Sequence, residues 1–257
     1  MGKKLSYCLY RVIKFLVWLF SPKIKMTGLE NIPEEAAIFV GNHAQMYGPI
    51  AAEVHFPVRR YTWCASQMMT LKEVPGYAME DFWWDKPRWI RPFYKLLSYI
   101  IAPISVCVFN NADTIPVYRD MRVRSTFEQS VEKLQEGTGL VIFPEWRTPY
   151  NHILYQFQER YVDIAYRYYK KTGKEVCFVP IYLAPRLKKM VIGKPIRYDS
   201  SIPVAKQRES INLYLMEEIT RMAEELPLHT VVPYLNMPKK NYPKSRPEAP
   251  VVQETDL

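Results

Sequence analysis

A histidine that follows a short apolar run is the residue best suited to do chemistry in this chain. Residues 36–40 are all apolar and predict a buried strand, and Asn42 and His43 come directly after Gly41 at its end. In α/β folds, sites form at the carboxyl ends of the strands. Because an imidazole has a pKa of about 6.5, His43 could take a proton from a hydroxyl group at neutral pH. A structural, hydrogen-bonded histidine is the alternative that this pattern alone leaves open.

Three further loops lie at predicted strand ends and could share a site with this histidine. They are residues 115–119, 143–148 and 179–182, and they supply Arg119, Glu145, Arg147 and Pro180. Arginine is the natural bidentate ligand for a phosphate group. Together with the histidine, the loops offer a base, a carboxylate and two guanidinium groups. Each loop taken singly is better explained as ordinary loop structure, and it is their order along the chain that predicts a site.

Strands that alternate with helices must position these loops. Apolar runs predict strands at residues 36–41, 57–64, 139–143, 176–182 and 189–193, and helical periodicity predicts helices at 49–54, 122–136, 152–171 and 204–226. Such alternation predicts an α/β fold with a largely parallel central sheet flanked by helices. We expect this domain to span residues 25–237. A disordered tail is predicted at residues 238–257, where proline, lysine and acidic residues dominate.

The composition limits the class of protein and the kind of partner. The chain has 257 residues, 48% of them apolar, which is enough for the core of one large domain and excludes global disorder. The net charge of +9 favours an anionic partner, such as nucleic acid, a phosphorylated substrate or an anionic membrane surface. Four cysteines without a C-x-x-C pair and four histidines without zinc spacing predict free thiols and no metal site.

The first 24 residues predict an amphipathic helix that lies in a membrane interface. They are basic and contain no acid, and the apolar run is shorter than a bilayer span and interrupted by Arg11 and Lys14. The segment is also a poor signal peptide, because no small-residue cleavage site follows. We expect a peripheral, monotopic protein on the cytoplasmic face of a membrane. A helix that packs on the protein's own core is the alternative, and the start of the chain also matches the N-myristoylation pattern at Gly2.

A second segment has the composition of a membrane-interface belt. Residues 82–95 mix aromatic side chains with lysine and arginine, and a long apolar run follows at residues 96–108. An ordinary apolar core segment is the main alternative. Aromatic and basic residues can also bind single-stranded nucleic acid by stacking. No RNP, KH or helix-turn-helix pattern supports that reading, so a nucleic-acid partner is not expected.

The order of four motifs resembles that of the phospholipid/glycerol acyltransferase family, whose best-known members are the 1-acylglycerol-3-phosphate acyltransferases. The motifs are Asn42-His43 and residues 115–119, 143–145 and 179–181, and the resemblance covers roughly residues 25–200. It implies transfer of a fatty acyl group from a thioester, acyl-CoA or acyl carrier protein, to a hydroxyl of a lysophospholipid or glycerol-phosphate-like acceptor. No bound cofactor is implied.

The resemblance also implies a role for each predicted site residue. His43 would be the general base, and Glu145 would shape the acceptor pocket beside it. Arg119 and Arg147 would hold the phosphate of the acceptor. The segment that contains Pro180 would line the acyl donor side, and Asn42 would lie beside the substrate as part of the first motif.

The chain departs from the family pattern in two of the motifs. The first motif of the family places an aspartate five residues after the histidine, and this chain has Gly48 there. In the third motif, Trp146 replaces a glycine and Arg147 falls one place early. Glu53, Asp113 and Glu145 are the nearby acids that could orient the histidine instead, and a large gain in rate in Gly48→Asp would show that the fold and both substrate sites are otherwise intact. The alternative is a catalytically impaired family member that binds lipid or membrane.

Overall fold

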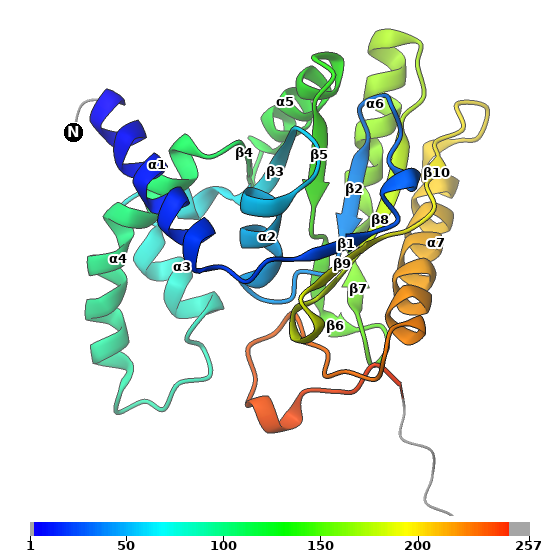
Figure 1. The fold of residues 1–257 in the computed structure, drawn as a ribbon. Helices are drawn as coiled ribbons and strands as arrows, with labels where there is room; N and C mark the ends of the chain where they lie inside the picture. Colours follow the sequence, from blue (N-terminus) through cyan, green and yellow to red (C-terminus); the bar gives the residue numbers. More distant parts are fainter. Residues whose placement is uncertain (1–2, 247–257) are drawn as a thin grey trace, which may run out of the picture.

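Short buried strands build a mixed sheet at the centre of the protein. In the computed structural model, which describes residues 3–246, eight strands form one sheet in the order β1-β9-β8-β2-β5-β3-β4, with β10 paired to β8 (Figure 1). Only the pairs β8–β9 and β8–β10 are antiparallel. The strands are β1 (Lys25–Thr27), β2 (Ile38–Gly41), β3 (Arg60–Ala65), β4 (Thr114–Val117), β5 (Gly139–Ile142), β8 (Cys177–Ala184), β9 (Lys189–Ile192) and β10 (Ile196–Arg197). The predicted α/β fold with a largely parallel sheet is confirmed.

Helices cover both faces of this sheet. The α-helices are α1 (Lys3–Phe20), α2 (Tyr47–His55), α3 (Val74–Asp81), α4 (Arg91–Asn111), α5 (Val123–Gln135), α6 (Asp163–Thr172) and α7 (Val204–Glu225). Short 3-10 helices lie at η1 (Leu29–Asn31), η2 (Ser66–Met69), η3 (Glu159–Val162), η4 (Pro185–Leu187) and η5 (Lys239–Asn241). In β2, Ile38 and Val40 pack with α5, α6 and α7, whereas Phe39 packs with Ala52 of α2 on the other face. This alternation follows from the two-residue period of a strand.

Helices α1 and α4 pack side by side at one end of the molecule, at the left of Figure 1. A narrow face of α1 meets the protein: Tyr10 is buried, and Asn111 of α4 donates a hydrogen bond to the Ser6 hydroxyl at 2.9 Å. The opposite face is apolar and exposed, with Phe15 and Leu19 more than half accessible. One face of the N-terminal helix therefore packs on the protein, and the broader apolar face remains uncovered.

Helix α4 also buries polar side chains and exposes apolar ones. Its small polar side chains Ser98 and Ser105 are buried, whereas Leu96 and Ile100 are more than 60% exposed. Among the described residues, it is the one helix that is long and apolar enough to cross a membrane by length and composition. Only 17% of its apolar stretch is buried, so α4 is not the ordinary core segment that was the main alternative for residues 96–108.

The predicted helix at residues 152–171 is wrong in its first half. Residues 145–157 instead form a two-stranded antiparallel sheet of β6 (Glu145–Pro149) and β7 (Tyr155–Phe157), and α6 begins only at Asp163. The reason is a turn at Asn151, whose side-chain oxygen accepts the backbone N–H groups of Ile153 and Leu154, both at 2.8 Å. Such a turn competes with helix formation.

The prediction of a disordered tail from residue 238 is wrong for residues 238–246. Lys244 forms a bridge with Thr230, and Ser245 is fully buried. The backbone N–H of His229 donates to the Ser245 hydroxyl at 3.2 Å. The folded domain therefore extends past residue 237, and the segment runs beneath the sheet in Figure 1. Residues 247–257 of the predicted tail and Gly2 of the predicted lipidation motif lie outside the described residues.

Candidate active site

His43 lies at the carboxyl end of β2, on a tight turn that leads into α2. Ala44 and Gln45 form this turn with φ angles of 45° and 55°, a left-handed conformation that residues other than glycine rarely adopt. The His43 ring lies edge-on against two aromatic rings, with centroids at 5.4 Å from Phe143 and 5.5 Å from Tyr234. The predicted position of the histidine at a strand end is therefore what the structure shows.

The turn fixes which nitrogen of the ring carries a proton. The Nδ1 atom of His43 lies 2.6 Å from the backbone carbonyl oxygen of Gln45. Because a carbonyl can only accept, Nδ1 must be the donor, and the Nε2 lone pair is left free in the neutral ring. Burial lowers the pKa of His43, although the Gln45 carbonyl and the charge of Asp81 oppose this effect. The ring is thus neutral at pH 7 and presents a basic nitrogen.

Glu145 forms a hydrogen bond with the backbone of His43 and none with its ring. One carboxyl oxygen accepts the His43 backbone N–H at 2.5 Å, and the other accepts the Tyr155 backbone N–H at 3.0 Å. The side chain is almost fully buried, and burial raises its pKa to about 7 even though both N–H donors act in the opposite direction. The geometry places Glu145 in the role of fixing the main chain at His43.

Two other predicted site residues, Asn42 and Pro180, contribute to the contact between β2 and β8. The Asn42 side chain donates to the Leu183 carbonyl at 3.0 Å and accepts the Leu183 N–H at 2.7 Å, so it joins β2 to β8. Pro180 lies in β8 in register with Val40 and is buried. Neither residue lines the cavity next to His43. We expected both residues to contact substrate. In the structure, the Asn42 side chain instead hydrogen bonds to β8, and Pro180 is packed within the sheet.

The two predicted phosphate-binding arginines come from different parts of the fold. Arg119 follows β4 and Arg147 lies in β6, and both side chains are exposed. Neither forms a hydrogen bond or ion pair with any other residue between 3 and 246 in the structure. Burial raises the pKa of Tyr234, and Arg147 and Arg119 both oppose that rise through their positive charges. Both guanidinium groups therefore lie in the electrostatic surroundings of the ring that packs on His43.

A largely apolar cavity opens beside His43 and runs between the sheet and the helices α1 and α4. Its volume is about 450 Å³, within the range of about 300–1,000 Å³ that is typical of ligand pockets. Residues from seven elements line it, including Val17 of α1, Ile50 of α2, Ala65 of β3, Tyr77 of α3 and Val108 of α4. The elements that expose apolar faces to the surroundings thus also form one side of the cavity.

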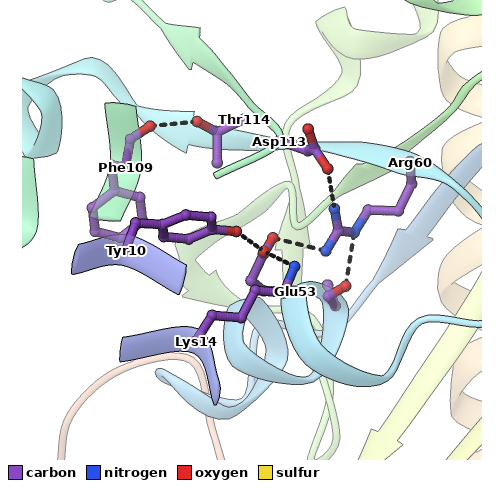
Figure 2. Close-up of polar contacts among 8 residues, drawn as sticks. Tyr10, Lys14, Glu53, Arg60, Phe109, Asp113 and Thr114 are labelled. Carbon is purple, nitrogen blue, oxygen red and sulfur yellow. Dashed lines mark hydrogen bonds and ion pairs between the residues drawn. The ribbon is translucent and has the colours of Figure 1, made fainter. Parts of the chain in front are cut away.

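A polar cluster anchors α1 to the wall of this cavity (Figure 2). The Glu53 carboxylate on α2 accepts hydrogen bonds from Tyr10 and Lys14 of α1, both at 2.5 Å, and from Arg60 of β3 at 2.7 Å. Burial opposes ionisation of Glu53, but the three partners together outweigh it and hold the pKa of the carboxyl below its ordinary value. The Asp113 Oδ2 atom lies 3.9 Å from the Nη1 atom of Arg60.

None of the three acids expected to replace the missing aspartate hydrogen bonds to the His43 ring. Glu53 and Asp113 pair with Arg60, and Glu145 binds backbone N–H groups. The Gln45 carbonyl takes that position instead, and no side chain in the sequence pattern could have indicated it. Asp81, which the sequence analysis missed, lines the cavity and is the acid whose charge favours protonation of the ring.

Gly48 is required by close packing against the His43 main chain. A Cβ atom at this position would lie 2.4 Å from the His43 carbonyl oxygen, far inside van der Waals contact. The Gly48 N–H also donates to that oxygen at 3.1 Å. Gly48→Asp is therefore not a clean test of a missing aspartate, because the new side chain would displace the turn that carries the histidine.

Comparison with known proteins gives a structural likeness only. No protein-family model and no curated protein match the chain. The structure is similar to the crystal structure of the 1-acyl-sn-glycerophosphate (LPA) acyltransferase PlsC from Thermotoga maritima, with 17% sequence identity and a TM-score of 0.48. The match covers 87% of this chain and 80% of that chain. At this identity, the activity of the present chain has to be inferred from its own site.

Three residues next to His43 come from the last part of the chain and carry no local signal in the sequence. Tyr234 packs on the ring, and Tyr242 and the Leu235 carbonyl bind the Gln45 side chain. A segment rich in proline and lysine gives no periodicity, so only the tertiary structure brings it to the site. Within residues 3–246, no group of three or more His, Cys, Asp or Glu side chains could hold a metal ion.

Proposed function

We propose that the protein is an acyltransferase that moves a fatty acyl group from a thioester donor to a hydroxyl group of a lysophospholipid or glycerol-phosphate-like acceptor. The observation that carries the proposal is the apolar cavity that begins at the neutral, half-buried His43 and lies against α1 and α4. A long acyl chain is the ligand that fits such a cavity, because nearly all of its surface is apolar. The order of the sequence motifs points to the same chemistry.

In this mechanism His43 is the general base. Its Nε2 atom takes the proton of the acceptor hydroxyl while the hydroxyl oxygen attacks the thioester carbonyl carbon. The carbon–sulfur bond then breaks, and the protonated imidazole returns the proton to the departing thiolate. The new ester leaves with the acceptor, and the free thiol of coenzyme A or of an acyl carrier protein is the second product. No step requires a bound cofactor.

The phosphate of the acceptor is assigned to Arg119 and Arg147. Both guanidinium groups are exposed and unpaired among residues 3–246, and their positive charges act on Tyr234, which packs on His43. Arginine binds phosphate oxygens through two parallel N–H bonds, which would also fix the direction in which the acceptor hydroxyl points. The net charge of +9 favours the same anionic ligand.

Substrate and product are membrane lipids, so the protein is proposed to work at a membrane surface. The exposed apolar faces of α1 and α4 would enter the interface, and basic residues such as Lys4 and Arg11 on α1 would meet anionic headgroups. We place the protein on the cytoplasmic face, as a peripheral protein, because the thioester donors are cytosolic.

The experiment is an acyl-transfer assay with pure protein, labelled acyl-CoA or acyl carrier protein, and a panel of lysophospholipids in vesicles. We expect transfer to a phosphate-bearing acceptor and loss of at least about a thousandfold in His43→Ala, since the general base is absent. His152→Ala is the matched control, because His152 belongs to the turn after β6 and lies outside the cavity. Equal transfer by the wild type and by His43→Ala would exclude this role for His43.

A protein that binds lipid without turnover is the second candidate. It is favoured by Gly48, which occupies the position of the expected aspartate and cannot be replaced without displacing the His43 turn. This candidate predicts binding to lysophospholipid vesicles and no labelled product with any donor. Detection of product that depends on His43 decides against it.

A further inference from the structure

The orientation of the His43 ring depends on a backbone turn. The Gln45 carbonyl accepts the Nδ1–H group at 2.6 Å, and no acidic side chain of residues 3–246 forms a hydrogen bond with the ring. The turn itself is unfavourable, because Ala44 and Gln45 both have the left-handed conformation. Something outside the turn must therefore stabilise it.

The Gln45 side chain connects the turn to the C-terminal segment, residues 231–246. Its Nε2 group donates to the Tyr242 hydroxyl at 2.8 Å and to the Leu235 carbonyl at 3.4 Å. Two backbone hydrogen bonds join the ends of this segment to each other and close it into a loop. Val231 donates its N–H to the Pro243 carbonyl at 2.9 Å, and the Ser245 N–H donates to the His229 carbonyl at 2.9 Å.

The same segment also covers the ring and reaches the wall of the cavity. Tyr234 lies edge-on to His43 with a centroid distance of 5.5 Å and also contacts the ring of Tyr155 at 5.9 Å. The Asn236 side chain donates to the backbone carbonyls of Asp81 and Phe82 at 3.3 and 3.4 Å. The segment thus contacts the turn, the ring and the end of α3 at once.

We propose that Gln45 and Tyr242 are positioning residues that hold the His43 imidazole in the Nδ1–H tautomer, with Nε2 directed at the substrate. The backbone carbonyl of Gln45 does what an aspartate does elsewhere, and Tyr242 keeps that carbonyl in place. The proposal rests on the proposed function only for the effect on turnover. The tautomer itself exists whether or not acyl transfer occurs.

The test uses long-range proton–nitrogen NMR of the isotope-labelled full chain, which distinguishes the two neutral tautomers of each histidine. His43→Ala identifies the His43 signals. We expect the Nδ1–H tautomer in the wild type and a clear rise of the Nε2–H tautomer in Tyr242→Phe, which removes the hydroxyl and keeps the ring. In the transfer assay, kcat should fall about threefold to tenfold, as expected for one lost hydrogen bond, with KM nearly unchanged.

Tyr214→Phe is the matched control. It removes the same group, and the Tyr214 hydroxyl donates to the Lys194 carbonyl at 3.0 Å on an exposed part of α7. Neither the tautomer of His43 nor kcat should change in this variant. If Tyr242→Phe does not fold, Gln45→Ala replaces it with the same readouts, since it removes the donor of the same hydrogen bond.

The outcomes separate the two proposals. A folded Tyr242→Phe protein with an unchanged tautomer and unchanged kcat overturns the positioning role, as does the Nε2–H tautomer in the wild type. If no acceptor yields product but the tautomer responds to Tyr242→Phe, the proposed function fails and the positioning role stands. If transfer depends on His43 but neither readout responds, the function stands and the positioning role fails.

Discussion

Glu145 shows how a residue that the sequence marks as catalytic can act through the main chain. Both of its oxygens accept backbone N–H groups, and burial raises its pKa from the ordinary value of 4.5 to about 7. The uncharged form is therefore favoured in the folded protein. Its stabilising contribution is full below pH 4.5, which is the pKa of the unfolded chain, and is lost as the pH rises through about 7.

We expect the free energy of unfolding to fall by about 3 kcal/mol between pH 4.5 and 8 because of this one group. Chemical denaturation of the wild type and of Glu145→Gln at a series of pH values measures it. The glutamine variant loses one acceptor at every pH, but it cannot titrate. The difference in unfolding free energy between the two proteins should therefore shrink as the pH rises, and a difference independent of pH would contradict the prediction.

At the scale of elements, a single carboxylate joins α1 to both α2 and β3. Glu53 binds Tyr10 and Lys14 from α1 and Arg60 from β3 (Figure 2), and the Arg60 side chain is only 6% exposed. Removing the carboxylate leaves a buried guanidinium without its main partner, whereas removing Lys14 leaves that pair intact. The two changes should therefore differ strongly in their effect on stability.

We expect Glu53→Gln to lower the free energy of unfolding by about 3 kcal/mol, in line with the breaking of a buried ion pair. Lys14→Met should cost less than about 1 kcal/mol, because the Lys14 side chain is 35% exposed and its charge is partly screened. Denaturant unfolding of the two variants checks this order. Equal losses would show that Arg60 finds another partner, such as Asp113.

For the molecule as a whole, the uneven distribution of apolar side chains sets one end apart. Leu19 of α1 and Ile100 of α4 are 54% and 61% exposed at the end of the molecule where these two helices pack together (Figure 1). The cavity beside His43 is bounded by the same two helices. The exposed apolar end of the molecule and the cavity are therefore built from the same two helices.

We expect the double change Leu19→Ser and Ile100→Ser to weaken binding to anionic lipid vesicles about tenfold or more, because two large apolar side chains no longer enter the lipid. The melting temperature should stay near that of the wild type, since both side chains are exposed. Leu213→Ser with Ile202→Ser is the matched control on and beside α7, where the exposed fractions are 43% and 41%. Cosedimentation with vesicles measures the binding, and an equal loss in the control pair would rule out a dedicated membrane face.

The sequence by itself determined five of the eight strands of the sheet, most of the helices and the place of His43, because these follow from local periodicity and from the end of an apolar run. It also indicated the apolar character of α1 and α4, which depends only on composition. Tertiary structure decided what surrounds the histidine. Tyr242 lies 197 residues beyond Gln45, and no pattern within either segment encodes their contact.

The same limit applies to the predicted site residues. Asn42, Glu145 and Pro180 have residue types that suit a binding site, yet strand pairing and backbone hydrogen bonds occupy them. Gly48 stands where the family pattern has an aspartate, and the structure leaves no room there for a side chain. A polar side chain is free for chemistry only if it does not already hydrogen bond to the backbone. Which side chains form such bonds is decided when segments distant in the sequence come together in the fold.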